Sequence, residues 1–421
     1  MIMLLRIALL AAALLLISPI TLAQSESGLP AAGPLEVIRL QNGLPGMSVR
    51  GYSWDADTGS PATVTRIDAG VRAAGSEVAV EPGDLWHIGS CTKAITATLL
   101  ATYVAEGRLS WTDTLAEALP DFAGDMSETA ANATIADLLR HRAGLPPNPT
   151  GVLMLRLFEE EARVGREAAI LEGLSEATNA PGPGDQGRYS NLGYMVAGVI
   201  AERLGGKAYE DLVVERVLMP LGIQEGEFGF GPPPAGDDAS APEQPMGHRR
   251  RGNQPWTPQL PTPEAKGLAA DNPAAFGPAG TMYLTLDAWS RFCMAHARSD
   301  DLQEGQRDAL GLSGVDYAEL HRPEEVFAAG WVIAQRGWAG DGEGGGIALT
   351  HNGSNTMWFA TAWIAPERDW VMLATTNAAG PTAAQACDQA VGVALGALRD
   401  TVDEESGGQS RPEQGEDQSS Q

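Results

Sequence analysis

Lysine is scarce in this chain of 421 residues, and acidic side chains outnumber basic ones. Only Lys93, Lys207 and Lys266 are lysines, and 28 basic residues face 54 acidic ones, so the formal net charge is −26. Proteins that bind nucleic acids neutralise phosphates with clustered basic residues, and the sequence contains no such cluster. The composition therefore argues against nucleic acid as a partner.

Cysteine is also sparse, and the histidines lack the spacing of metal ligands. Cys91, Cys293 and Cys387 do not form the closely spaced even set of a disulfide framework, although the sequence leaves open whether two of them pair. The six histidines contain neither an H-x-H nor an H-E-x-x-H pattern. We therefore expect no metal site and no cofactor.

The sequence has only one long apolar run, at its start. Residues 7–20 are apolar, Arg6 is the single charge before them, and Thr21-Leu22-Ala23 supplies small residues at the −3 and −1 positions of a cleavage site. This pattern predicts a signal peptide over residues 1–23 and a secreted or periplasmic protein. The alternative is an uncleaved membrane anchor, but a spanning helix needs about 20 apolar residues and this run is shorter. After cleavage we expect no contact with the membrane.

Strand-like segments lie at both ends of the remaining chain, and helical segments lie in its middle. Residues 47–54 and 63–71, and four segments between residues 327 and 376, are rich in β-branched and aromatic residues. The pattern predicts an α/β (α+β) domain over residues 24–402, with one sheet built from both ends. A mostly helical insertion is expected at about residues 110–280.

Two segments depart from regular patterning. Residues 224–280 are rich in proline and glycine, which is typical of a functional rim. Residues 403–421 contain no Leu, Ile, Val or aromatic residue and are mostly acidic or polar. We expect them to form a disordered acidic tail.

Ser90-Cys91-Thr92-Lys93 opens a predicted helix over residues 91–106. A serine and a lysine three positions apart on the first turn share a helix face. A buried neutral lysine can take the serine proton, and the helix N-terminus favours the anion that forms. The alternative is a serine N-cap next to an unrelated lysine.

Tyr189-Ser190-Asn191 precedes a second predicted helix, 189 − 90 = 99 residues after Ser90. A tyrosine can transfer a proton if a nearby cation lowers its pKa from about 10. The amide of Asn191 can orient a substrate carbonyl or the lysine. The alternative is a core tyrosine followed by an asparagine N-cap.

His351-Asn352-Gly353-Ser354 ends a strand-like run. A glycine on an edge strand lets a substrate backbone approach closely, and the N–H of Ser354 is a candidate oxyanion donor. Two alternatives compete with this interpretation. Asn-Gly is a common hairpin turn, and Asn352-Gly353-Ser354 is also a glycosylation sequon.

The three motifs, in this order, resemble those of the serine β-lactamase and DD-peptidase superfamily, and in particular its class C-like branch. That branch also holds periplasmic esterases and D-aminopeptidases. The similarity spans about residues 35–400 and includes flanking stretches such as 134–146 and 187–223. It implies a β-lactamase/transpeptidase-like fold, with an antiparallel sheet flanked by helices and an inserted helical domain.

The resemblance also implies a role for each motif residue. Ser90 would be the nucleophile that forms an acyl-enzyme, and Lys93 and Tyr189 would manage the protons, with the identity of the general base left open. Asn191 would contact Lys93 or the substrate amide. The third motif, with His351, Gly353 and Ser354, would bind the substrate, and the N–H groups of Ser90 and Ser354 would form the oxyanion hole.

One departure from the family pattern bears on the substrate. The third motif begins with His351 instead of the lysine of most class C β-lactamases, and a neutral imidazole binds a carboxylate less firmly than an ammonium group. We therefore expect hydrolysis of ester or amide bonds in a small molecule or peptide. The alternatives are a true β-lactamase, a DD-carboxypeptidase acting on cell-wall peptides, and a non-catalytic binding protein that retains the fold. The sequence leaves the oligomeric state open.

Overall fold

The computed structural model describes residues 33–178, 187–260, 271–322, 326–340, 342 and 344–408, with side chains up to residue 402. Pro34–Gln421 is assigned to one compact unit. The predicted signal peptide and residues 409–421 of the predicted tail lie outside the described residues. Within the described part, no helix is long and apolar enough to cross a membrane.

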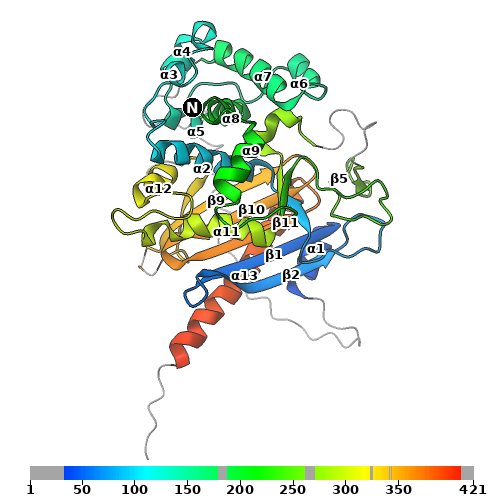
Figure 1. The fold of residues 1–421 in the computed structure, drawn as a ribbon. Helices are drawn as coiled ribbons and strands as arrows, with labels where there is room; N and C mark the ends of the chain where they lie inside the picture. Colours follow the sequence, from blue (N-terminus) through cyan, green and yellow to red (C-terminus); the bar gives the residue numbers. More distant parts are fainter. Residues whose placement is uncertain are drawn as a thin grey trace, which may run out of the picture. The chain divides into compact units, whose positions relative to one another are not determined.

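Both ends of the chain contribute to one six-stranded sheet (Figure 1). The strand order is β2-β1-β11-β10-β9-β8, and every neighbouring pair is antiparallel. The prediction of a common sheet built from both ends is confirmed. The strands are β1 (Gly46–Asp55), β2 (Ser60–Gly70), β8 (Val332–Arg336), β9 (Gly346–Ser354), β10 (Phe359–Ala365) and β11 (Trp370–Thr376).

Helices cover both faces of this sheet because the side chains of its strands alternate between two cores. Along β11, Val371 and Leu373 join the larger core, to which α11 (Leu286–Ala297) also belongs. Met372 and Ala374 point the other way, toward α13 (Pro381–Gly408) and α1 (Pro34–Gln41). Strands buried on both faces are therefore apolar at nearly every position.

The last helix, α13, is longer than expected. It continues through Gly408, which is six residues beyond the expected end of the domain at residue 402. The helix thus includes the first six residues of the predicted tail. Residues 403–405 are Asp-Glu-Glu, and glutamate has a high helix propensity, so the absence of apolar residues does not end the helix.

Helices dominate the middle of the chain, and two of them are buried nearly all round. Thr92 to Tyr103 of α2 are all buried, as are Leu192 to Glu202 of α8. Other helices of the region, among them α5, α7 and α9, contact α8. The helices are α2 (Thr92–Ala105), α3 (Leu115–Ala118), α4 (Glu128–Asn132), α5 (Ile135–Leu139), α6 (Gly151–Leu157), α7 (Ala162–Glu176), α8 (Asn191–Gly205), α9 (Tyr209–Val213) and a π turn at Val214–Leu218.

A small second sheet contributes the strand that leads into α2. Its order is β3-β7-β4, and the chain passes from β3 directly into the 3₁₀ turn Gly89–Cys91. The segment expected to be an irregular rim thus holds short strands in its described part. The remaining elements are β3 (Leu85–His87), β4 (Phe228–Phe230), β5 (His248–Arg249), β6 (Thr257–Pro258), α10 (Gly277–Gly280), β7 (Met282–Thr285) and α12 (Gly314–His321).

Candidate active site

Ser90 lies in a tight turn between β3 and α2, and we call residues 88–91 the nucleophile turn. Gly89 in this turn has φ +50, a conformation that residues with a side chain rarely adopt. A Cβ at Gly89 would lie 2.3 Å from the backbone nitrogen of Ser354. The turn therefore needs glycine both for its backbone conformation and for its close contact with the end of β9.

Lys93 is fully buried on the first turn of α2, and all its hydrogen-bond partners are neutral. Its Nζ lies 3.2 Å from Ser90 Oγ, 2.7 Å from Asn191 Oδ1 and 2.6 Å from the carbonyl oxygen of Ala279. Burial lowers the pKa of Lys93 to about 7. Near neutral pH, Lys93 is therefore deprotonated in a large fraction of the molecules, and its neutral amine can accept a proton from Ser90.

Tyr189 is placed against the same two residues. Lys93 Nζ lies 4.8 Å from the centre of its ring, and its hydroxyl group hydrogen-bonds with Ser90. Burial raises the pKa of Tyr189, and the hydrogen bond with Ser90 only partly offsets this effect. The condition that a nearby cation lowers this pKa is therefore not met, because burial is the larger effect and also disfavours the charge of Lys93.

Asn191 orients the amino group of Lys93. The N-cap of α8 is Ser190, whose side chain accepts a hydrogen bond from the Gly193 N–H, so the alternative of an asparagine N-cap does not apply. The Asn191 side chain instead accepts from Lys93 and donates to Asn148 Oδ1 at 2.8 Å. Asn148 was not singled out by the sequence, because the loop before α6 carries no motif that marks it.

His351 lies at the end of β9 and faces the same cluster. It is buried, its Nδ1 hydrogen-bonds with the carbonyl oxygen of Asn352, and burial together with the charge of Lys93 lowers the pKa of His351 to about 4. The imidazole is therefore neutral at physiological pH. It presents no positive charge to a substrate carboxylate.

The sequence interpretation of this motif needs one correction, because β9 is not an edge strand. β8 pairs with it on the outer side, but the pairing ends at Thr350. Residues 351–354 therefore extend past β8, and in the described part of the chain no strand pairs with them on that side. Residues 351–354 thus form an edge that is open on one side, although β9 as a whole lies between β8 and β10.

Gly353 and Ser354 bring β9 against the nucleophile turn. A Cβ at Gly353 would lie 1.8 Å from the carbonyl oxygen of Ile88, so only glycine fits here. The Ser354 hydroxyl donates to the carbonyl oxygen of Trp358 and accepts from the Thr356 N–H, which closes the turn after β9. The hydroxyl is thus used within the protein, and the predicted oxyanion donor at this position is the backbone N–H.

His141 is a further residue at the site that no motif predicted. Its φ is 60, its ring centre lies 4.5 Å from that of Tyr189, and its Nδ1 accepts a hydrogen bond from the Ser190 N–H. Burial and the charge of Lys93 lower the pKa of His141 to about 3. The one signal for it is that it lies within the family-like stretch 134–146.

The model of the Beta-lactamase family matches residues 35–395 of this chain. The chain belongs to this family. Penicillin-binding protein 4 of Amycolatopsis lactamdurans is 25% identical over 357 residues, which cover 81% of this chain and 83% of that protein. This relationship confirms the resemblance inferred from the three motifs, and it makes the chain an enzyme of the serine hydrolase type.

Solved structures share the fold at low sequence identity. The D-amino acid amidase of Ochrobactrum anthropi has a TM-score of 0.62 at 17% identity, covering 89% of this chain and 98% of the amidase. The class C β-lactamase of Rhodobacter sphaeroides has a TM-score of 0.61 at 16% identity, covering 88% of this chain and 98% of that enzyme. The predicted β-lactamase-like fold is confirmed.

One cysteine, Cys91, directly follows Ser90 in the sequence of this Beta-lactamase family member. Cys91, Cys293 and Cys387 are buried and unpaired. Burial raises the pKa of the Cys91 thiol, which keeps it protonated beside Ser90. In the part of the chain that the structure describes, no group of three His, Cys, Asp or Glu side chains is arranged to hold a metal ion.

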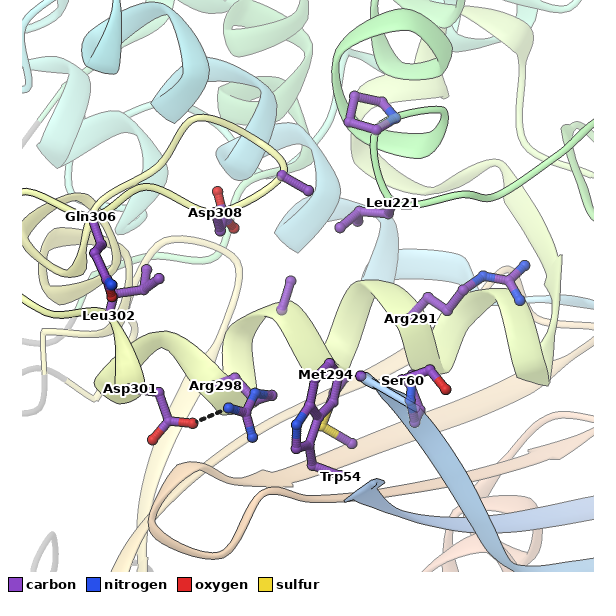
Figure 2. Close-up of a pocket in the computed structure, with 15 residues that line it drawn as sticks. Trp54, Ser60, Leu221, Arg291, Met294, Arg298, Asp301, Leu302, Gln306 and Asp308 are labelled. Atoms are coloured by element: carbon purple, nitrogen blue, oxygen red, sulfur yellow. Dashed lines mark ion pairs between the residues drawn. The ribbon is translucent and has the colours of Figure 1, made fainter. Parts of the chain in front are cut away.

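A cavity lies beside α11 and the β1–β2 hairpin (Figure 2). It has a volume of about 500 Å³, and Trp54 and Met294 belong to its lining, as do Arg291 and Arg298. Both arginines form ion pairs, and Figure 2 shows Arg298 directed at Asp301. None of the predicted site residues lines this cavity. This cavity is therefore distinct from the cluster around Ser90.

Proposed function

We propose that this chain is an exported serine hydrolase that cleaves ester or amide bonds through an acyl-enzyme on Ser90. One observation carries the proposal. Ser90 Oγ lies 3.2 Å from the amino group of Lys93, which is fully buried among neutral partners. A serine next to such a lysine is an activated nucleophile, because the neutral amine can act as its base.

Lys93 is the general base in this proposal. A neutral amine has two N–H groups and one lone pair, and Asn191 Oδ1 and the Ala279 carbonyl oxygen accept the two N–H groups. The lone pair is then directed at Ser90, whose proton it takes as Oγ attacks the substrate carbonyl. The lowered pKa of Lys93, about 7, suits a base that works near neutral pH.

Tyr189 relays the proton to the leaving group. Its raised pKa keeps the phenol neutral, so it can donate its proton to the leaving oxygen or nitrogen and recover one from Lys93. Water then attacks the acyl-enzyme by the same steps in reverse order. The N–H groups of Ser90 and Ser354 receive the oxyanion in both half-reactions.

The substrate class follows from the charge of the site. His351 is neutral, and its one ring proton is on Nδ1, which donates to the Asn352 carbonyl oxygen. Its Nε2 therefore offers a substrate carboxylate neither a hydrogen-bond donor nor a positive charge. This favours esters and small amides over β-lactams. The relationship to a penicillin-binding protein supports the alternative, a β-lactamase or DD-carboxypeptidase.

Export is part of the proposal and rests on residues 1–23 alone. Their single positive charge, apolar run and small residues at positions 21 and 23 are typical of a cleaved signal peptide. N-terminal sequencing of the protein expressed in a Gram-negative host would test it. A mature chain that begins at Gln24 is the expected result, and an intact Met1 in the exported fraction would contradict it.

The proposed function is tested by labelling and turnover. The wild type should react with a fluorescent fluorophosphonate at Ser90 and hydrolyse a short-chain p-nitrophenyl ester faster than nitrocefin. Ser90→Ala should abolish both labelling and turnover by several orders of magnitude. Cys91→Ala should retain both, since the buried thiol is protonated. Turnover that survives in Ser90→Ala would disprove the assignment of the nucleophile.

A further inference from the structure

A buried hydrogen-bond network contacts the nucleophile turn through Gly89. Its residues belong to none of the three sequence motifs. Its centre is the carboxylate of Asp271, which is 8% exposed. The carboxylate has three partners: His87 Nε2 at 3.0 Å, the amide Nδ2 of Asn355 at 2.6 Å and the backbone N–H of Asn272 at 2.7 Å. His87 is 1% exposed and Asn355 is 4% exposed.

The first arm of the network holds the nucleophile turn. The backbone N–H of Gly89 donates to His87 Nδ1 at 3.1 Å. A backbone N–H can only donate, so Nδ1 must be the unprotonated nitrogen and Nε2 must carry the proton that goes to Asp271. Asp271 thus selects the one imidazole tautomer that can accept from Gly89, the residue with φ +50 directly before Ser90.

The second arm holds the turn that follows Ser354, residues 355–358. Asn355 donates to Asp271 and accepts the backbone N–H groups of Met357 and Trp358. The indole of Trp358 in turn stacks on His87, with ring centres 5.4 Å apart. One carboxylate therefore links the turns on both sides of the contact between Gly89 and Ser354.

A third arm reaches the loop that accepts from Lys93. Asn272, next to Asp271, donates through its side chain to the Gly280 carbonyl oxygen at 3.0 Å. The neighbouring carbonyl oxygen of Ala279 is an acceptor of Lys93 Nζ. The same buried cluster is therefore connected to the nucleophile, the base and the end of β9.

We infer that His87 and Asp271 are positioning residues that set the distance between the N–H groups of Ser90 and Ser354. This inference rests on the proposed function, since those N–H groups matter only if an oxyanion forms between them. Neither side chain needs to touch the substrate. Their effect falls on the transition state, because oxyanion donors must be placed where the charge develops.

Three variants and one control test this inference. His87→Phe removes both ring nitrogens. Asp271→Asn keeps the size of the side chain, but its Nδ2 would face His87 Nε2. The ring proton would then move to Nδ1, against the Gly89 N–H. His87→Asn retains an acceptor two residues before Gly89. His296→Phe is the matched control, since His296 is a fully buried histidine with two hydrogen bonds elsewhere in the core.

We expect kcat for the p-nitrophenyl ester to fall about 100- to 1000-fold in His87→Phe and Asp271→Asn, with KM unchanged, which is the range seen when one oxyanion donor is lost. His87→Asn should recover most of the rate. His296→Phe should lower the melting temperature as much as His87→Phe does but leave kcat unchanged. All assays are run below the melting temperature of the least stable variant. If His87→Phe does not fold, the comparison of Asp271→Asn with the wild type tests the inference.

The outcomes separate this inference from the proposed function. If wild-type turnover depends on Ser90 but Asp271→Asn stays within twofold of the wild-type kcat, the positioning role is wrong and the hydrolase remains. A His87→Asn variant as slow as His87→Phe would also overturn it. If the wild type neither labels with the fluorophosphonate at Ser90 nor turns over any ester or nitrocefin, both the function and the inference fall together.

Discussion

Burial determines the protonation states at the candidate active site. It lowers the pKa of Lys93, His141 and His351 and raises that of Tyr189, so each side chain is shifted toward its neutral form. A serine, a neutral amine and a neutral phenol in mutual contact can exchange protons without creating a buried charge in the resting enzyme. Lys93 is assigned as the base because its buried amine is deprotonated near neutral pH.

Replacing Lys93 tests that assignment. Lys93→Met should slow acylation by about 10²- to 10⁴-fold, the usual contribution of a general base. In the wild type, kcat/KM should rise as the pH increases through about 7, because only the deprotonated lysine can accept a proton. Lys207→Met is the control, since Lys207 is exposed and paired with Glu215. A pH-independent rate between pH 5 and 9 would contradict the assignment.

Tyr189→Phe tests the proton relay. The variant keeps the ring against Lys93 but loses the hydroxyl group beside Ser90, so stopped-flow bursts should show acylation slowed about 100-fold or more. Tyr194→Phe is the matched control. It loses a buried hydrogen bond to the Leu139 carbonyl oxygen and should cost stability without changing the burst rate. A wild-type burst in Tyr189→Phe would remove Tyr189 from the mechanism.

His351→Lys tests the basis of substrate choice. A hydrogen bond to a charged group contributes about 1.5–3 kcal/mol, so the ratio of kcat/KM for nitrocefin to that for the ester should rise roughly 10- to 100-fold. Wild-type enzyme that hydrolyses nitrocefin efficiently and lacks esterase activity would show that His351 does not set the preference.

At the scale of elements, the site depends on how closely β9 approaches the turn before α2. Gly89 and Gly353 face each other across this contact, and neither position has room for a Cβ. The end of β9 and the nucleophile turn are therefore held in one relative position. Since backbone atoms fill the space, no side-chain rearrangement can accommodate a larger residue.

Gly353→Ala should disrupt both stability and activity. The added methyl would lie 1.8 Å from the Ile88 carbonyl oxygen, so β9 and the nucleophile turn must separate. We expect a lower melting temperature and a kcat reduced at least 100-fold, in line with a misplaced oxyanion donor. Gly392→Ala in α13 is the control, because that site is open and alanine is about 1 kcal/mol better than glycine in a helix. If Gly353→Ala and Gly392→Ala had the same melting temperature and the same kcat, the close contact at Gly353 would not be required.

At the scale of the whole molecule, neutral histidines are spread through the interior. Burial lowers the pKa of His141 and His321 to about 3 and that of His248 and His351 to about 4. An unfolded chain would bind protons at these residues near pH 6.5. Acid should therefore favour unfolding well above the range in which carboxylates titrate.

Stability should accordingly decrease as the pH falls from 7 to 5. The folded pKa of each histidine lies below its unfolded value, so the stabilisation is complete above about pH 6.5 and is lost as the pH decreases. Each such histidine contributes a slope of about 1.4 kcal/mol per pH unit. Urea unfolding at pH 7 and pH 5 measures this, and His248→Gln should reduce the slope. Equal free energies of unfolding at the two pH values would contradict it.

The family, the sheet built from both ends and the identity of the motif residues could all be predicted from the sequence alone. These depend on local spacing and side-chain type, such as the three-residue separation of Ser90 and Lys93. The sequence did not reveal His87, His141, Asp271 or Asn148, because each acts through a partner far away in the chain. Spacing along the chain carries no information on such contacts.

The charge states of the site residues and the close contacts between β9 and the nucleophile turn depend on the tertiary structure. A nearby cation would lower the pKa of Tyr189, but burial, which depends on the packed surroundings, raises it. β9 was expected at an edge, but the pairing that ends at Thr350 leaves only its last residues open. The physical reason is the same in both cases: desolvation and strand pairing are set by residues that meet only when the chain is folded.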